Sequence, residues 1–169
     1  ATFRYHMKNF DLDKYKTIIY SLDRYFKLLK NENIKTIKLT DHKESLRKIY
    51  ETLSAIDGIK FTGAPKLMHL RNPDLFIMWD GYIRGEKKKE YYNAIDLFKR
   101  GDYKIKKYKS NFEGYFDFLK DMKNHFDSLK FNNKNKSLAK AIDEFNYVKI
   151  TIPIQEMEKK EKENKKKSK

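Results

Sequence analysis

The chain contains no cysteine, only three prolines and only six glycines in its 169 residues. The lack of cysteine excludes disulfides, thiolate metal sites, iron–sulfur clusters and cysteine nucleophiles. Histidines are also few, and His6, His42, His69 and His125 lack the close pairing of a zinc site. No phosphate-binding loop and no serine-elbow motif is present. We therefore expect neither a metal nor a cofactor.

Long apolar runs are absent as well. No stretch approaches the length of a membrane span, and the N-terminal residues lack the apolar core of a secretory signal. The hydrophobic content of 39% and the aromatic content of 15% still provide enough apolar surface for a core. A chain of this size suits one domain, which we expect over residues 1–155. We expect a cytoplasmic protein without a membrane partner, and we favour a monomer.

Positive charge dominates the polar residues, because the formal net charge is +15 at pH 7. Residues 156–169 carry seven lysines and four glutamates, so most of the excess charge lies in residues 1–155. The same C-terminal residues contain one apolar side chain, Met157, and we expect a charged tail that is disordered or a frayed helix. A field of this sign favours association with nucleic acid. The alternative is a lysine-rich surface that serves only solubility.

Apolar residues recur at spacings of three and four along most of the chain, which is the pattern of amphipathic helices. Period-two alternation is nearly absent, so we expect a single all-α domain of about seven helices with little or no β structure. The β-branched segment 148–154 is expected to form an extended strap across the bundle. Three of the expected helices have both ends assigned, at residues 11–30, 86–99 and 110–129. Four more are expected to begin near residue 40 and at residues 62, 80 and 137.

Capping residues mark the starts of several of these helices. Asp41 with Glu44, and Ser110 with Glu113, have the spacing of a capping box. Other expected N-caps are Thr62, Asp80 and Ser137, and we place Pro65 in the first turn of the helix that Thr62 begins.

Residues 58–84 concentrate the scarce backbone-shaping residues, since they hold half of the glycines and two of the three prolines. Such a concentration indicates tight turns that present polar groups at helix starts. We expect the functional site in this stretch.

The order of parts here, a helix, a glycine turn, a short helix and an Asp at the start of the next helix, resembles the helix-hairpin-helix DNA glycosylases. The residues that carry the resemblance are Leu53, Ala55-Ile56-Asp57-Gly58-Ile59, Gly63-Ala64 and Asp80-Gly81-Tyr82-Ile83-Arg84. In that family the amides of the hairpin lie against DNA phosphates, which the resemblance assigns to Gly58 and Gly63. The family's catalytic aspartate matches Asp80, with Arg84 four residues later, and we expect Arg84, Lys60 and Thr62 to contact the nucleic acid. That aspartate activates a nucleophile or stabilises the cationic sugar after the nucleotide is flipped out.

The resemblance leaves two registers open for the family's Schiff-base lysine. The second hairpin glycine of the family falls on Lys60, and the usual spacing back from Asp80 puts the lysine position on Thr62. In the other register Gly63-Ala64-Pro65-Lys66 resembles the glycine-Pro-Lys form of the hairpin in 8-oxoguanine glycosylases, and Lys66 is then the nucleophile. Lyase activity depends on which register holds.

Other residues complete the candidate site. Lys66 and His69 lie three residues apart on one expected helix and could line a pocket together. Trp79 could stack on a base. The basic, aromatic-interleaved connector 104–109 has the composition of a phosphate-contacting loop, through Lys104, Lys106, Lys107 and Lys109. Each of these residues also has a purely structural interpretation, as a core residue, a helix cap or a solvated side chain.

Three functions follow. The first is a protein that binds double-stranded DNA and excises a damaged base flipped into a pocket near Asp80. The second is a non-catalytic nucleic-acid-binding module on the same scaffold. The third is an all-α protein-interaction domain.

Overall fold

The computed structural model describes residues 11–95, 106–127, 131, 133 and 135–167. In chain order the helices are α1 (Leu12–Leu28), α2 (Lys43–Ser54), α3 (Lys60–Arg71), α4 (Lys89–Ala94), α6 (Phe112–Phe126), α7 (Leu138–Asn146), the π-helical turn η2 (Tyr147–Thr151) and α8 (Ile152–Lys167). No strand occurs in this part of the chain, so the predicted all-α class is confirmed.

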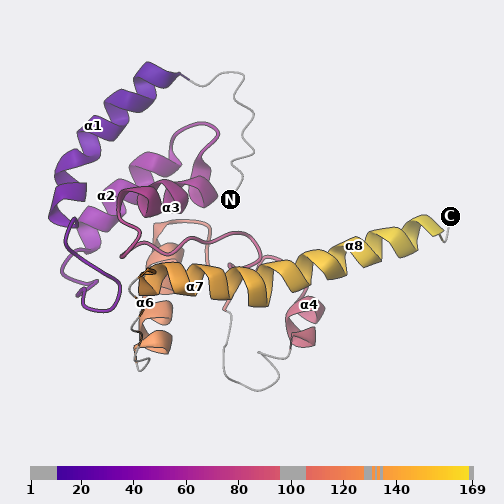
Figure 1. The fold of residues 1–169 in the computed structure, drawn as a ribbon. Helices are drawn as coiled ribbons and strands as arrows, with labels where there is room; N and C mark the ends of the chain where they lie inside the picture. The colour runs from indigo at the N-terminus through magenta and orange to yellow at the C-terminus, as the bar shows by residue number, and fades with distance from the viewer. Residues whose placement is uncertain (1–10, 96–105, 128–130, 132, 134, 168–169) are drawn as a thin grey trace.

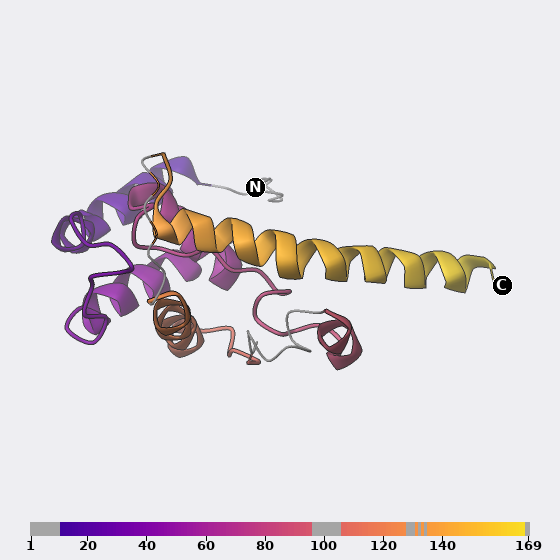
Figure 2. The same ribbon diagram turned by 60° about the horizontal axis from the view of Figure 1, so that its bottom comes forward.

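The helices form a compact body with one long projection. α1, α2 and α3 gather at one end, and α2 packs against α1, α3 and α6 (Figure 1). α7, η2 and α8 follow one another without a break, and the C-terminal part of α8 stands away from the body (Figure 2). The division into a domain over residues 1–155 and a charged tail over residues 156–169 stays a prediction. α8 is a continuous helix across residue 155.

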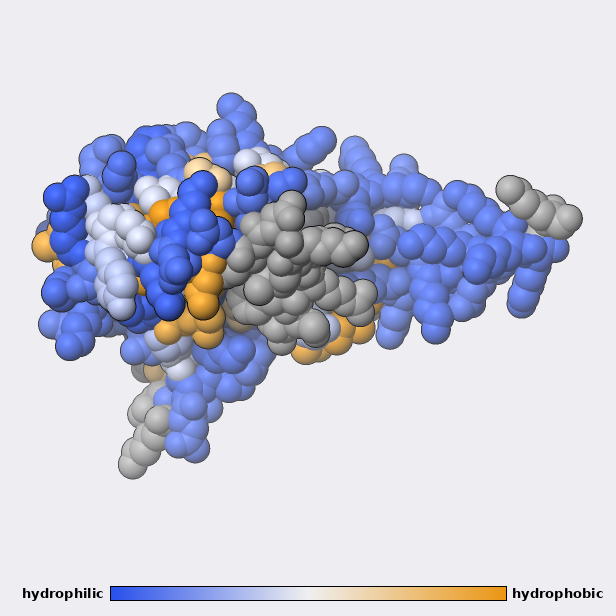
Figure 3. Space-filling model, turned by 90° about the horizontal axis from the view of Figure 1, so that it is seen from above, coloured by the Kyte–Doolittle hydropathy of each residue, from blue (hydrophilic) through white to orange (hydrophobic). Residues whose placement is uncertain are grey.

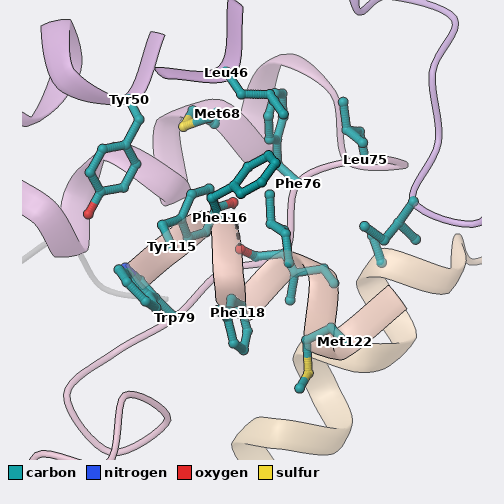
Figure 4. Close-up of a cluster of buried hydrophobic side chains, with 14 of the residues drawn as sticks. Leu46, Tyr50, Met68, Leu75, Phe76, Trp79, Tyr115, Phe116, Phe118 and Met122 are labelled. Carbon is teal, nitrogen blue, oxygen red and sulfur yellow. Dashed lines mark hydrogen bonds between the residues drawn. The ribbon is translucent and has the colours of Figure 1, made fainter. Parts of the chain in front are cut away.

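Aromatic side chains fill the centre of the body (Figure 4). The Tyr115 ring stacks on Tyr50 at a centroid distance of 5.2 Å and meets the edge of Trp79 at 5.1 Å. Trp79 also lies 5.6 Å from Phe118. Such pairs contribute about 0.5–1.5 kcal/mol each beyond the burial of their area. The Tyr115 hydroxyl is satisfied because it donates to the carbonyl oxygen of Ile77 at 2.9 Å.

The hairpin between α2 and α3 requires unusual backbone conformations. Gly58 has φ of 82° and Lys60 has φ of 48°. Lys60 is the one non-glycine residue with positive φ in the described part of the chain, at the position that the resemblance gives to a hairpin glycine. A side chain in this region costs free energy, so surrounding contacts must hold the turn in place.

Pro65 lies well inside α3, so the expected N-cap at Thr62 is wrong. α3 begins at Lys60, and its N-cap Ile59 offers no side-chain acceptor. A proline inside a helix has no N–H to donate to the carbonyl oxygen four residues earlier. For Pro65 this is the carbonyl oxygen of Phe61. The Trp79 indole N–H donates to that oxygen at 3.0 Å and the Tyr50 hydroxyl at 3.2 Å. The core therefore supplies the donors that Pro65 lacks.

Both expected capping boxes are wrong, and the expected N-cap at Ser137 is confirmed. The side chain of Ser137 accepts from the Lys140 amide at 3.1 Å, as predicted. α2 begins only after His42, which makes no side-chain cap, and Asp41 instead accepts from the Thr40 hydroxyl. α6 is capped by Asn111, one residue after the expected Ser110, because the Asn111 side chain accepts from the Gly114 amide at 3.0 Å.

Segment 148–154 is helical, so the expected extended strap is wrong. η2 and the start of α8 occupy it, and Ile150 and Ile154 are both fully buried. Burial of these two side chains, one helical turn apart, outweighs the strand preference of β-branched residues.

The expected helix at 86–99 is described only in part. α4 covers Lys89–Ala94, and residues 96–99 lie outside the described part of the chain.

Candidate functional site

A pocket of about 580 Å³ lies between α3, the segment 78–83 and the α7–η2–α8 helix. Both predicted catalytic residues, Lys66 and Asp80, line it. Ionisable or polar side chains that sequence reasoning did not select complete its wall, and these are Lys140, Asp143, Glu144, Tyr147, Thr151 and Gln155.

Asp80 heads a single turn rather than the expected helix. Its carbonyl accepts from the Arg84 amide at 3.0 Å, but the chain does not continue as a helix after residue 85. Its Oδ1 accepts from the amides of Tyr82 and Ile83 at 2.8 and 2.9 Å, and its Oδ2 accepts from the Thr151 hydroxyl at 3.0 Å. Three donors thus hold this half-buried carboxylate as a fixed acceptor at the edge of the pocket.

Of the two positions that the resemblance offers for the lysine, Lys66 lines the same pocket as Asp80 and Thr62 does not. Lys66 projects from α3 into the lining of the pocket. The Thr62 hydroxyl instead accepts from the Arg84 guanidinium at 2.9 Å and does not line the pocket.

Arg84 and Trp79 are buried, which argues against the contacts to nucleic acid expected of them. Arg84 is 2% exposed, and its guanidinium donates to Thr62 and pairs with Glu86 at 2.8 Å. Trp79 is 1% exposed, so neither face of its ring is open to a base. Both side chains support the hairpin from within, since the Arg84 guanidinium also lies over the Phe61 ring.

His69 is buried in α3, where it contacts Asp143 of α7 rather than the open pocket. Its Nδ1 lies 2.7 Å from the carbonyl oxygen of Phe76, so Nδ1 carries the hydrogen, and 3.4 Å from Asp143 Oδ2. Burial lowers the pKa of His69. Asp143 Oδ1 accepts from the Met78 amide at 2.6 Å, while Oδ2 is buried without a hydrogen bond. Burial raises the pKa of Asp143 to about 7.

Asp143 was not selected from the sequence, because an aspartate in an amphipathic helix is normally expected on the solvent-exposed face. The signal was its place on the apolar face of α7, whose buried positions are spaced by one, three and four residues, at Ala139, Ile142, Asp143 and Asn146. A carboxylate on such a face is buried by the docking of the helix, which makes it a candidate for function.

The π-helical turn adds two exposed side chains to the pocket wall, beside Met78 and Ile83 of the segment 78–83. Tyr147 and Val148 are 52% and 53% exposed, and both line the pocket. π-helical turns occur frequently at functional sites, because the extra residue per turn redirects side chains. An extended segment over residues 148–154, as expected from the sequence, would not predict that Tyr147 and Val148 line a pocket.

The hairpin presents its charge at the turn. Gly58 and Lys60 are exposed, whereas Gly63 is buried inside α3 and cannot meet a phosphate. The first turn of a helix carries amides without intrahelical acceptors, and in α3 no side chain caps them. Six residues separate Lys60 from Lys66, which is about 9 Å along the helix axis.

The basic connector is seen only from residue 106, and Lys104 lies outside the described part of the chain. Lys106, Lys107 and Lys109 are exposed, and Lys106 pairs with Asp121 at 3.0 Å. The backbone of Lys109 lies tight against α6, because a Cβ on Gly114 would stand 1.9 Å from the carbonyl oxygen of Lys109. A glycine is therefore needed where the connector meets α6.

Within residues 11–95, 106–127 and 135–167 no helix combines the length and the apolar character needed to cross a bilayer. The same residues hold no group of three or more His, Asp or Glu side chains that could bind a metal ion. Comparison with protein-family models, with curated proteins and with solved structures gave no match to this chain.

Proposed function

We propose that this chain binds double-stranded DNA and receives an extruded base in the pocket lined by Lys66 and Asp80, where it cleaves the N-glycosidic bond. The observation that carries the proposal is the meeting of these two side chains in one pocket, with Lys66 on the helix that starts at the hairpin turn. The net charge of +15 supports a polyanionic partner.

The geometry assigns Asp80 an electrostatic role. When the glycosidic bond breaks, its electron pair leaves with the base and positive charge develops on the deoxyribose. A carboxylate already held by three hydrogen bonds changes little during the reaction, and it can stabilise that charge at no cost in reorganisation. Water then adds to C1′ of the sugar and loses a proton.

Lys66 is the candidate nucleophile of a combined glycosylase and lyase reaction. Its amine would displace the base from C1′, and the base would leave with the electron pair of the glycosidic bond. Loss of the amine proton and cleavage of the C1′–O4′ bond would then open the sugar and give an imine at C1′ and a hydroxyl at C4′. Sodium borohydride reduces such an imine and links protein to DNA covalently, so the adduct reports the lysine directly.

The test is incubation with duplexes that carry uracil, 8-oxoguanine or an abasic site, followed by alkali and by borohydride trapping. We expect strand breaks at one lesion, lost in Asp80→Asn and retained in Asp117→Asn, an exposed residue of α6. Trapping should disappear in Lys66→Gln and persist in Lys48→Gln, an exposed residue of α2. Product formation that Asp80→Asn leaves unchanged would contradict the role of this carboxylate.

The second candidate is binding without catalysis. It is favoured by the complete engagement of both Asp80 oxygens within the fold, which is also what a purely structural cap requires. Salt-dependent binding to every duplex, without cleavage of any, would establish this alternative.

A further inference from the structure

Two lysines near the pocket, Lys87 and Lys88, form ion pairs with glutamates of α8. Glu158 Oε1 lies 3.0 Å from Lys87 Nζ, and the other oxygen of Glu158 accepts from the Tyr82 hydroxyl at 2.9 Å. One turn later, Glu161 accepts from Lys88 Nζ at 2.6 and 2.8 Å and from the Tyr91 hydroxyl. α8 thus places two carboxylates on consecutive lysines.

This contact lies at the edge of the pocket. Ile83 and Gln155 both line it, and Gln155 is one turn before Glu158 on α8. A helix rises by about 4.5 Å over three residues, so Glu158 stands just beyond the pocket wall. The phosphates of a duplex that delivered a base to the pocket would pass along this edge.

The contact is also easily exchanged. α4, which follows Lys88, has six residues and none of them is buried. The Lys88 side chain of the Lys88–Glu161 pair is 56% exposed, whereas the side chains of the Lys87–Glu158 pair are 31% and 22% exposed. Exposed ion pairs contribute about 0.2–1 kcal/mol each, and a phosphate offers a lysine the same kind of contact.

The remaining acidic residues of this part of α8 provide a comparison within one helix. Glu156 and Glu163 are exposed, whereas Glu158 and Glu161 are turned to the segment 82–91. The projecting arm of α8 is hydrophilic along the face seen in Figure 3. Its carboxylates therefore divide into a pair that covers lysines and a pair that faces solvent.

We propose that Glu158 and Glu161 occupy Lys87 and Lys88 in place of phosphate, and that DNA displaces them, so that these lysines become backbone contacts of the complex. This inference rests on the proposed DNA binding. α8 is then an intramolecular competitor that weakens non-specific binding, since Glu158 must take up a cation when Lys87 leaves, whereas Glu161 keeps Lys165, whose Nζ lies 2.8 Å from its Oε1.

The test compares two double variants with the same change of charge, Glu158→Gln with Glu161→Gln and Glu156→Gln with Glu163→Gln. Affinity for a fluorescent 20-base-pair duplex is measured by anisotropy from about 50 to 300 mM NaCl, the range over which phosphate contacts are lost. Glutamine still accepts from Tyr82 and Tyr91, and thermal unfolding followed by circular dichroism confirms that each variant is folded.

We expect the 158/161 variant to bind about tenfold more tightly than the 156/163 variant at 50 mM salt. Its plot of log K against log salt should be steeper by about 1, because the variant no longer has a Glu158 that must take up a cation, while Glu161 of the parent keeps Lys165 as a partner. Adding Lys87→Gln and Lys88→Gln to the 158/161 variant should remove both gains.

Equal affinities and equal slopes for the two glutamate variants would overturn the inference while leaving DNA binding intact. Absence of binding in every protein, the parent included, would overturn the proposed function and this inference with it.

Discussion

Asp143 is a residue whose environment conflicts with its charge. Its Oδ2 is buried without a donor, and burial raises the pKa of the carboxyl to about 7 from an ordinary value of 3.8. The folded state therefore holds a proton that the unfolded chain has already released between these two pH values. Folding stability from this group is greatest below pH 3.8 and falls as the pH rises toward 7.

Asp143→Asn should remove this pH dependence. Asparagine keeps the acceptor for the Met78 amide and cannot ionise, so the stability of the variant relative to the parent should rise by about 2 kcal/mol between pH 5 and pH 8. Urea unfolding at a series of pH values measures it. Burial lowers the pKa of His69, whose contribution runs in the opposite direction and is present in both proteins. Glu144→Gln, an exposed neighbour, should show no such rise, and a parallel pH profile for Asp143→Asn would contradict the account.

Pro65 and Trp79 are coupled through the Phe61 carbonyl, because Pro65 cannot donate to this oxygen and the Trp79 indole does. In Pro65→Ala the new amide supplies the missing donor to that oxygen. The loss of unfolding free energy caused by Trp79→Phe should then be about 1 kcal/mol smaller in the Pro65→Ala variant than in the parent. A double-mutant cycle from chemical unfolding measures this coupling. Additive costs would show that the indole hydrogen bond does not compensate for the proline.

At the scale of elements, the contact between Gly114 and Lys109 fixes the basic connector on α6. A Cβ at position 114 would overlap the Lys109 backbone, which is not a flexible neighbour. Gly114→Ala should lower the free energy of unfolding by about 3 kcal/mol, whereas Asp117→Ala on the exposed face of α6 should change it by less than about 0.5 kcal/mol. Thermal and urea unfolding distinguish the two. A tolerated Gly114→Ala would mean that the connector does not lie on α6 as described.

Helices could be predicted from the sequence where apolar spacing decided them, and their ends less well. Asn111 and Ser110 are neighbours with nearly equal capping ability, so only the docking of α6 selects between them. The chain around Ile150 has strand propensity, but its burial beside Ile154 makes it helical. Local preference cannot reveal either outcome, because both are decided by contacts with distant segments.

The candidate site follows the same division. Asp80 and Lys66 could be selected from the sequence because they belong to a recognisable order of turn and helix, and the structure brings both to one pocket. Arg84 and Trp79 belong to the same stretch but turn inward. Asp143 and Tyr147 join the pocket from more than 60 residues after Asp80 in the sequence, and no spacing rule connects such distant positions.

At the scale of the whole molecule, the use of the positive charge distinguishes a DNA-binding protein from one whose lysines serve only solubility. The chain carries a net +15, and in the free protein α8 pairs part of the lysine excess with its own glutamates. A lysine-rich surface that serves only solubility would bind no polyanion in a specific geometry. A surface that follows a duplex would bind through several phosphates at once, with an affinity that salt reduces steeply.

The most direct measurement is the affinity of the parent protein for a fluorescent 20-base-pair duplex, determined by anisotropy at several salt concentrations. The account predicts binding whose log K falls linearly with log salt with a slope of about −3 or steeper, as neutralisation of several phosphates requires. Undetectable binding at 50 mM salt, or an affinity that salt does not change, would contradict it.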